Sequence, residues 1–306
     1  MWTRSRFADE YVPGMFALMI DTYKTERAEQ MADKLCTVKT SKKAYEEIGI
    51  RSGLGAPSVK GEGAPITFDT QIAGAKQTFT PKVYVLAVRI TEEAIDDNLY
   101  ELNGGGEGQL KNLSDDIGRS LAENYETITA RLFNYATATT YFTTRDSVAF
   151  ASASHTRLNG STYSNKATNS DLTYLAFWSC VVAAENQYDH RQQRIKRKIK
   201  KIWYPPQLER QAREATYSPD RPDTGNRAVN AMKQSGRKIE HCNWSHMTDE
   251  DMWVLQMEGD GCYRFDNRKT RFAREKDFQT GDMMVKGDQR FSVGINDERC
   301  FYFNVP

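Results

Sequence analysis

Two apolar strand patterns joined by a turn constrain the fold of this chain more than any other feature. They predict a two-stranded ribbon over about residues 64–90, with a turn at Gly74. Alternating apolar positions mark both strands: Ile66, Phe68 and Ile72 on the first, and Val83, Val85 and Ala87 on the second. No third strand is evident beside them, and an isolated two-stranded ribbon is marginally stable in water. The ribbon therefore needs another surface, which a neighbouring copy of the chain would supply. The pattern favours an assembly subunit over an enzyme.

The composition is that of a folded protein with almost no net charge. Its 306 residues can hold one large domain or two modest ones. Basic residues number 42 and acidic residues 41, so the chain has no global field that would gather nucleic acid. No apolar run reaches the ~18 residues of a membrane helix. Asp9 and Glu10 precede any apolar stretch, unlike in a signal peptide. Five scattered cysteines indicate free thiols in a reducing compartment.

A long amphipathic helix is the clearest predicted element. Apolar residues recur every three or four positions: Leu110, Leu113, Ile117, Leu121, Tyr125, Ile128, Leu132 and Tyr135. This period predicts a helix of about 28 residues, about 42 Å long. Shorter helices are predicted from an N-cap at Thr91, over about 171–188, and over 207–215 after two prolines. Residues 248–251 have the form of a capping box.

A second hairpin is predicted at the end of the chain. Its strands carry alternating apolar residues: Phe291, Val293 and Ile295, then Phe301, Phe303 and Val305. Asn296 and Asp297 lie between them and would supply the turn.

Seven short phrases stand in a characteristic order along the chain. They are Ser41–Glu47, Glu62–Asp69, Ile90–Asp97, Phe150–His155 ahead of Asn169 and Leu172, Trp203–Pro206 ahead of Leu208 and Ala212, Asp249–Leu255, and Arg290–Gly294. In this order the phrases resemble the major capsid proteins of tailed double-stranded DNA phages, which have the Hong Kong 97 fold. The resemblance covers nearly the whole chain.

The resemblance implies an α+β fold of four parts. Residues 1–52 would form an N-terminal arm, and residues 53–90 an extended loop that lies across a neighbouring subunit. Residues 91–167 and 276–306 would form the peripheral domain, with the long helix as its spine. Residues 168–275 would form the axial domain near the symmetry axes.

The resemblance also implies a structural function without catalysis or cofactors. The chain would be a major capsid protein that self-assembles into the hexamers and pentamers of an icosahedral head enclosing double-stranded DNA. It would reside in the virion after assembly in the host cytoplasm, without contact with a membrane. The implied partners are further copies of itself, a scaffolding protein, a portal, a decoration protein and DNA bound non-specifically. Because the arm begins near residue 1 without a long acidic or coiled-coil prefix, we expect a separate scaffolding protein or an already mature chain.

Two alternative functions remain open from the sequence. One is the shell of a cargo-holding nanocompartment of the same fold, with a pocket for a cargo peptide and no DNA. The other is a zinc- or thiol-dependent enzyme. Its candidate ligands are His241, Cys242, His246 and Cys262, because zinc takes sulfur and nitrogen ligands in tetrahedral sets. This set lacks a Cys-x-x-Cys pair, so we favour incidental cysteines and histidines.

Nucleophilic catalysis has weak candidates. Ser152 or Ser154 could act with His155, but side chains adjacent on an extended segment point to opposite faces, so Ser154 and His155 would not pair. Cys180 lies in an apolar helical stretch and is predicted to be a core residue.

Two acidic pairs and a glycine-rich segment are also interpreted structurally. Glu92–Glu93 and Asp96–Asp97 suit the positive end of a helix dipole. Residues 103–108 lack the spacing of a dinucleotide loop. They are interpreted as a hinge between the ribbon and the long helix.

A basic run holds seven charges within eleven residues. It comprises Arg191, Arg194, Lys196, Arg197, Lys198, Lys200 and Lys201. These side chains could contact phosphates on the inner face of a shell. We favour a solvated strand or pairing with acidic groups, because a strongly basic lining would retain DNA that must leave the shell.

Overall fold

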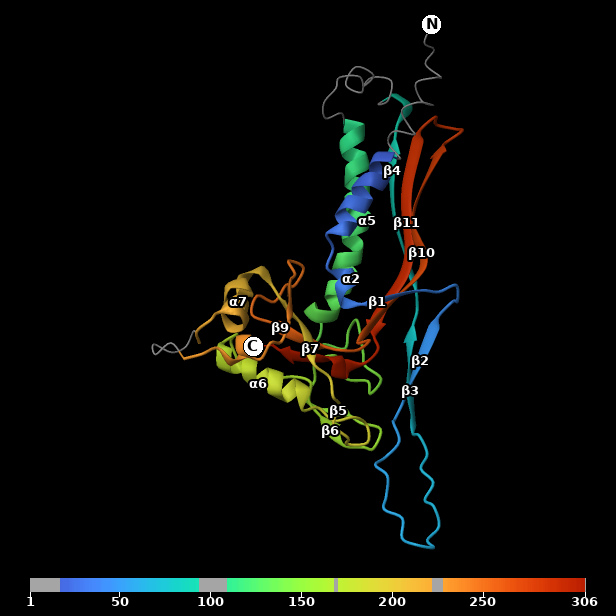
Figure 1. The fold of residues 1–306 in the computed structure, drawn as a ribbon. Coiled ribbons are helices and arrows are strands. Elements are labelled where there is room, and N and C mark those ends of the chain that lie inside the picture. The colour runs from blue at the N-terminus through green and yellow to red at the C-terminus, as the bar shows by residue number, and fades with distance from the viewer. Residues whose placement is uncertain (1–16, 94–108, 168–169, 222–227, 306) are drawn as a thin grey trace. The chain divides into compact units, whose positions relative to one another are not determined.

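The computed structural model describes residues 17–93, 109–167, 170–221 and 228–305, and for residues 109–112 and 114 the backbone alone. The chain divides into two compact units, each built from segments distant in the sequence (Figure 1). Unit 1 combines Met1–Ala44, Thr80–Thr129 and Arg264–Val293. Unit 2 combines Tyr45–Phe79, Ala130–Tyr263 and Gly294–Pro306.

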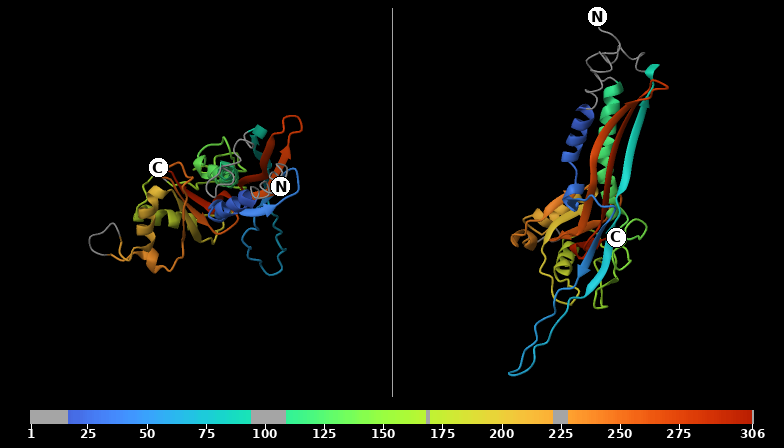
Figure 2. Two further views of the ribbon diagram at one scale, coloured as in Figure 1. Left: turned by 90° about the horizontal axis from the view of Figure 1, so that it is seen from above. Right: turned by 90° about the vertical axis from the view of Figure 1, so that its right-hand side faces the viewer.

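Unit 1 is a four-stranded sheet packed against helices. The sheet has the order β1-β10-β11-β4, with bounds Thr37–Thr40 for β1, Cys262–Lys276 for β10, Met283–Ile295 for β11 and Lys82–Ile90 for β4. Helix α5 spans Gln109–Asn134, residues 17–28 are helical, and α2 spans Ala32–Leu35. The right-hand view in Figure 2 shows α5 running along the sheet. The long helix predicted from the sequence is therefore confirmed.

The core of unit 1 lies between α5 and the sheet. Two buried clusters fill it, one of Met19, Ile117, Leu121 and Val285 and one of Tyr125, Ile128 and Phe291. Strand β4 turns alternate residues inward, so that Leu86, Val88 and Ile90 pack against the first cluster. Val83 and Val85 face outward and are 51% and 58% exposed. The alternation predicted over 83–87 is thus real.

The predicted pairing of the ribbon is wrong. Strand β4 pairs with β11, with Val88 opposite Val285. Strand β3, Ala73–Phe79, pairs with β2, Glu46–Arg51. Residues 52–72 form no strand, since two prolines and three glycines within 55–65 interrupt any backbone ladder.

The expected turn at Gly74 is also absent. Gly74 lies within β3, where a β-carbon would stand 2.5 Å from Ile50 Cγ2 and 2.7 Å from Leu158 Cδ2. This glycine therefore serves close packing and not a change of chain direction.

Unit 2 is a second sheet covered by helices. Its order is β12-β9-β7-β8, with bounds Phe301–Asn304 for β12, Trp253–Met257 for β9, Ile199–Tyr204 for β7 and Glu240–Asn243 for β8. The helices are α6 (Tyr174–Glu185), α7 (Glu209–Tyr217) and α8 (Ala231–Gln234), with a 3-10 turn η1 (Pro206–Leu208) ahead of α7. The short strands β5 (His155–Thr156) and β6 (Thr162–Tyr163) form a separate hairpin. The helices predicted over 171–188 and 207–215 correspond to α6 and α7.

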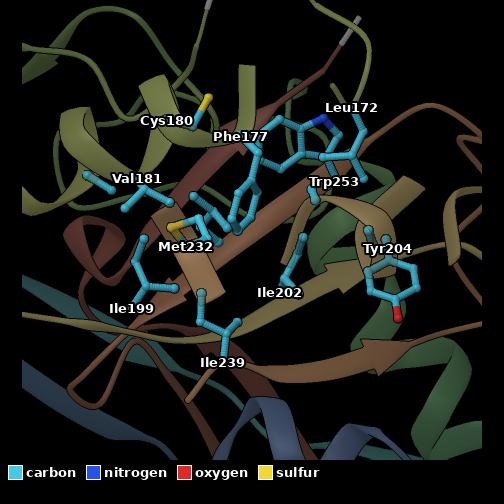
Figure 3. Packing of buried hydrophobic residues seen from close by; sticks show 14 of the residues in the cluster. Leu172, Phe177, Cys180, Val181, Ile199, Ile202, Tyr204, Met232, Ile239 and Trp253 are labelled. Carbon is cyan, nitrogen blue, oxygen red and sulfur yellow. The ribbon is translucent and has the colours of Figure 1, made fainter. Parts of the chain in front are cut away.

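The core of unit 2 gathers side chains from α6 and the sheet. Figure 3 shows Phe177 of α6 beside Ile202 of β7 and Trp253 of β9, all three buried. Met232 of α8 and Ile239 close the same cluster. The local sequence of β9 is continuously buried, as is typical of a central strand.

The predicted C-terminal hairpin is wrong. Strand β11 belongs to the first sheet, whereas β12 pairs antiparallel with β9 in the second. Between them lies a buried 3-10 turn, η2, at Glu298–Cys300, in which the Arg299 backbone amide donates a hydrogen bond to the Asp297 side chain. This buried and ion-paired turn replaces the exposed two-residue turn that a hairpin requires.

The capping-box interpretation of residues 248–251 is also wrong, because strand β9 follows and no helix begins there. Among the described residues, no helix is long and apolar enough to span a membrane.

Candidate assembly surface

The loop between β2 and β3 carries the most exposed apolar side chains of unit 2. Val59, Ile66 and Phe68, which we name the apolar loop surface, are 101%, 67% and 93% exposed. Ile72 at the end of the loop is 38% exposed. The prediction that Ile66, Phe68 and Ile72 are poorly covered in a single chain is therefore confirmed. Figure 1 shows this loop extending well beyond β2 and β3.

The root of this loop is held by an ion pair. Asp69 Oδ1 accepts a hydrogen bond from Arg191 Nη1 at 3.1 Å, and Asp69 Oδ2 accepts one from Gly55 N at 2.6 Å. Arg191 also donates to the carbonyl oxygen of Thr70 and, at 3.4 Å, to Ser52 Oγ. The Gly55 amide and then the Thr70 amide and Arg191 lower the pKa of Asp69, against a raising effect of burial. We name these five residues the Asp69–Arg191 cluster.

Other exposed apolar side chains lie on regular elements and on one turn. Leu175 and Val182 of α6, seven residues apart on one face, are 58% and 43% exposed. Such a helix, apolar on both faces, is typical of a buried position. Phe278, in the turn between β10 and β11 of unit 1, is 101% exposed. These positions join Val83 and Val85 as surface that a single chain leaves in water.

Unit 2 contains a buried ionic cluster that the sequence did not predict. Asp297 accepts hydrogen bonds from Arg299 Nε at 2.9 Å and from Arg197 Nη2 at 2.8 Å. Burial raises the pKa of Asp297, but the two guanidinium groups outweigh it and hold the pKa well below its usual range. Next to it, Tyr163 Oη donates to Glu298 Oε1 at 2.6 Å. The only sequence signal was the charged run Asp297–Arg299 beside two apolar strands.

The candidate serines and His155 do not form a nucleophilic set. His155 is fully buried, and its ring nitrogens face Asp146 Oδ2 at 3.0 Å and the Phe150 carbonyl oxygen at 3.3 Å. Ser152 Oγ lies 3.4 Å from Ser154 Oγ. The hydrogen bonds of His155 are thus structural.

Cys180 is buried in α6, and burial raises the pKa of its thiol to about 11. A thiol with so high a pKa is a poor nucleophile at neutral pH. This position agrees with the prediction that Cys180 is a core residue.

The four candidate zinc ligands do not converge. Within the described ranges, no three His, Cys, Asp or Glu side chains are arranged to hold a metal ion. His241 uses both ring nitrogens in hydrogen bonds, with Tyr204 Oη at 3.1 Å and Thr216 Oγ1 at 2.9 Å. Burial lowers its pKa to about 4. Cys242 and Cys262 are buried, and His246 Nδ1 lies 3.5 Å from Ser245 Oγ.

The basic run is largely engaged within unit 2. Arg191 and Arg197 pair with Asp69 and Asp297, as described above. The remaining contacts join Arg194 to Asn186 at 2.7 Å, Lys200 to Glu258 at 3.4 Å and Lys201 to Glu240 at 3.8 Å. These partners favour the interpretation of the run as a segment paired with acidic and amide groups.

The acidic pairs are only partly described. Glu92 lies in a helical turn and pairs with Lys276 Nζ at 3.0 Å. Asp96, Asp97 and the proposed hinge at 103–108 lie outside the described residues.

Comparison with solved structures identifies the fold. The capsid of the native GTA particle has 9% identical residues and a TM-score of 0.58, covering 90% of this chain and 90% of that chain. The capsid of Cyanophage P-SCSP1u has 13% identity and a TM-score of 0.55, covering 88% and 86%. The virus-like particle from Pyrococcus furiosus has 9% identity and a TM-score of 0.55, covering 97% and 100%. No protein-family model and no curated protein matches the chain.

At these identities the similarity establishes the fold. The chain has the mixed α+β fold of capsid and virus-like-particle proteins. This result confirms the Hong Kong 97-like fold predicted from the sequence.

Proposed function

We propose that this chain is the major capsid protein of a tailed phage, which self-assembles into the hexamers and pentamers of an icosahedral head enclosing double-stranded DNA. In this proposal, residues 1–52 act as an arm and residues 53–90 as the extended loop. Residues 91–167 with 276–306 form the peripheral domain, and residues 168–275 the axial domain. The subunit acts structurally in the virion and not as an enzyme, and it assembles in the host cytoplasm with scaffolding, portal and decoration proteins.

The apolar loop surface is the observation that carries this proposal. On this one loop, Val59 and Phe68 stand almost wholly in water and Ile66 is two-thirds exposed, so that they add little to the core of a single chain. Burying a large apolar side chain is worth about 1.5–3 kcal/mol. Repeated over every symmetry-related contact of a shell, burial of this surface would supply a large share of the assembly free energy. The fold, shared with capsid proteins, supports the same conclusion.

Electron microscopy and sizing chromatography of the purified chain test the proposal. We expect closed particles, or hexamers and pentamers that convert to particles. A chain that remains monomeric over a wide concentration range, with and without a crowding polymer, would contradict self-assembly.

The substitution Phe68→Ser is predicted to block assembly. Because the side chain is 93% exposed, the melting temperature of the monomer should stay unchanged while the yield of particles falls. The matched control is Gln71→Ser, an exposed polar position of the same loop, which should assemble as the wild type does. Unaltered assembly of the Phe68→Ser variant would show that the loop surface is not an interface.

A cargo-holding shell is the second candidate function. The observation in its favour is the match to the Pyrococcus furiosus particle, which extends over 97% of this chain and all of that chain. Nuclease-treated particles distinguish the two functions. Protected double-stranded DNA would support the phage head, and co-purifying protein cargo without DNA would support the compartment.

A further inference from the structure

The loop that carries the apolar loop surface consists of a fixed root and a weakly bonded distal part. In the described chain, the distal residues 56–68 make two hydrogen bonds among themselves, Ser58 Oγ with Thr67 Oγ1 at 3.2 Å and Ala64 N with Gly61 O at 3.1 Å. The root is tied more densely. Ser52 N donates to the Ile72 carbonyl oxygen at 2.9 Å, and Ile72 N donates to Ser52 Oγ at 2.8 Å. The direction of the distal part is therefore decided at the root.

Arg191 joins both arms of that root to another segment of unit 2. Its Nη1 donates to Asp69 on the returning arm, and its Nε donates to Ser52 on the outgoing arm. The ion pair also packs closely against the outgoing arm. A β-carbon at Gly55 would stand 3.2 Å from Asp69 Oδ2 and 3.5 Å from Arg191 Nη1.

The segment that presents Arg191 is itself a rigid turn. Asp189 Oδ1 accepts hydrogen bonds from the backbone amides of Arg191 and Gln193, both at 2.8 Å. Gln192 adopts a positive φ of 60°, a strained conformation that the surrounding bonds maintain. Gln193 Nε2 adds a hydrogen bond to the Leu54 carbonyl oxygen at 3.3 Å. Arg191 thus reaches the loop from a fixed support.

We propose that Arg191 is a positioning residue, which holds the root of the loop so that the apolar loop surface is aimed at a second copy of the chain. The inference rests on the proposed function, because the occupant of that surface is another subunit. Arginine suits this role, since its planar fork serves the Asp69 carboxylate, the Thr70 carbonyl and the Ser52 hydroxyl at once. A lysine at the same position would satisfy only part of this set.

The first experiment measures loop order in the unassembled chain. Hydrogen exchange in peptides covering residues 52–55 and 69–72 is compared between wild type and Arg191→Gln. We expect exchange to rise roughly tenfold or more, the change produced by losing a hydrogen bond to a charged group. The matched control is Arg194→Gln, which removes the same charge from the same basic run. The wild-type Arg194 side chain contacts Asn186 and Tyr188 and not the loop. This variant should exchange as the wild type does.

The second experiment measures assembly of the same variants. We expect Arg191→Gln to need a higher protein concentration to form particles, Arg191→Lys to recover part of the loss, and Arg194→Gln to assemble normally. Asp69→Asn breaks the same ion pair by removing the charge of the carboxylate, and so provides an independent test. The double variant should lose less than the sum of the two single variants, because both remove the Asp69–Arg191 ion pair. Circular dichroism and melting temperature confirm that each variant is folded.

The outcomes separate this inference from the proposed function. Unchanged loop exchange in Arg191→Gln overturns the positioning role. Increased exchange with wild-type assembly shows that positioning is irrelevant to docking and overturns the inference, while the proposed function stands. If the wild-type chain itself fails to assemble, the proposed function and the docking step both fail. The exchange data then still decide whether Arg191 holds the loop.

Discussion

At the scale of single residues, His155 shows how unit 2 stabilises a buried charge. Both of its ring nitrogens face acceptors, the Asp146 carboxylate and the Phe150 carbonyl oxygen, and only the protonated imidazole donates to both. The Tyr163 ring stacks on it with a centroid distance of 5.2 Å. Burial lowers the pKa of His155, but the hydrogen bond and charge of Asp146 outweigh burial and raise it above 6.5. Against burial, the His155 and Thr144 bonds lower the pKa of Asp146 to about 2.

These shifts predict the pH dependence of stability. Because the pKa of His155 is raised on folding, its contribution is complete below the unfolded value of 6.5 and is lost as pH rises through the folded pKa. Because the pKa of Asp146 is depressed, its contribution is complete above 3.8 and is lost as pH falls towards 2. Denaturant unfolding should therefore show that the unfolding free energy contributed by His155, measured as the difference between wild type and His155→Gln, is smaller at alkaline than at mildly acid pH.

The variant His155→Gln should lose about 3 kcal/mol at mildly acid pH, because it leaves the Asp146 carboxylate without its charged partner. The loss relative to the wild type should become smaller at alkaline pH, where the wild-type imidazole is neutral. The double variant Asp146→Asn/His155→Gln is the control and should recover part of the loss. A loss of the same size at both pH values would mean that the charge of His155 does not contribute to stability.

At the scale of elements, one glycine sets how closely two helices of unit 1 approach. A β-carbon at Gly118 of α5 would lie 2.7 Å from the Met19 carbonyl oxygen and 3.3 Å from Tyr23 N, both backbone atoms. The helical residues 17–28 are further tied to α5 by Thr22 Oγ1, which donates to Asp115 Oδ1 at 2.6 Å. Close approach of the two backbones thus depends on the missing side chain.

Gly118→Ala should destabilise the protein although alanine is the better helix former. The helix-propensity gain is roughly 0.5–1 kcal/mol, whereas overpacking costs about 1–3 kcal/mol. We expect a net loss of about 1 kcal/mol in the unfolding free energy. Hydrogen exchange should accelerate within residues 17–28. Ser120→Ala, at an exposed position of the same helix, is the control and should leave that exchange unchanged. A stabilised Gly118→Ala variant would show that the two helices separate without cost.

Sequence patterns predicted which segments form helices and strands better than they predicted which strands pair with one another. The period of apolar residues in α5 is a local property, and it identified the helix within one residue at each end. The alternation in β4 correctly identified Val83 and Val85 as sharing a face, but a period of two does not specify the pairing strand. That strand, β11, lies about 200 residues further along the chain.

The clusters of unit 2 were hidden from the sequence for the same reason. Asp69 and Arg191 are separated by 122 positions, and Arg197 and Asp297 by 100. Neither pair has a motif, because any acidic and basic side chains that the fold brings together can form such a bond. The exposed Ile66 and Phe68 could be identified, since an isolated two-stranded ribbon leaves the side chains of one face uncovered, although the strand pairing itself was wrong.

At the scale of the whole molecule, the two units share three continuous elements. Helix α5 passes from unit 1 to unit 2 after Thr129, and β10 and β11 each have residues in both units. A helix or strand that begins in one core and ends in the other cannot remain intact if only one core unfolds. We therefore expect the units to unfold together, although each has its own buried clusters.

The five cysteines provide the measurement for this prediction. All are free and buried, with Cys36 in unit 1 and Cys180, Cys242, Cys262 and Cys300 in unit 2. Because all five side chains are buried, native thiols should react negligibly with an alkylating reagent at neutral pH, and burial also raises the pKa of Cys300 to about 12. In increasing guanidinium, mass mapping should give Cys36 and Cys242 the same labelling midpoint. Labelling of Cys36 at a lower midpoint would show that unit 1 opens alone. In that case the continuity of α5, β10 and β11 does not couple the two cores.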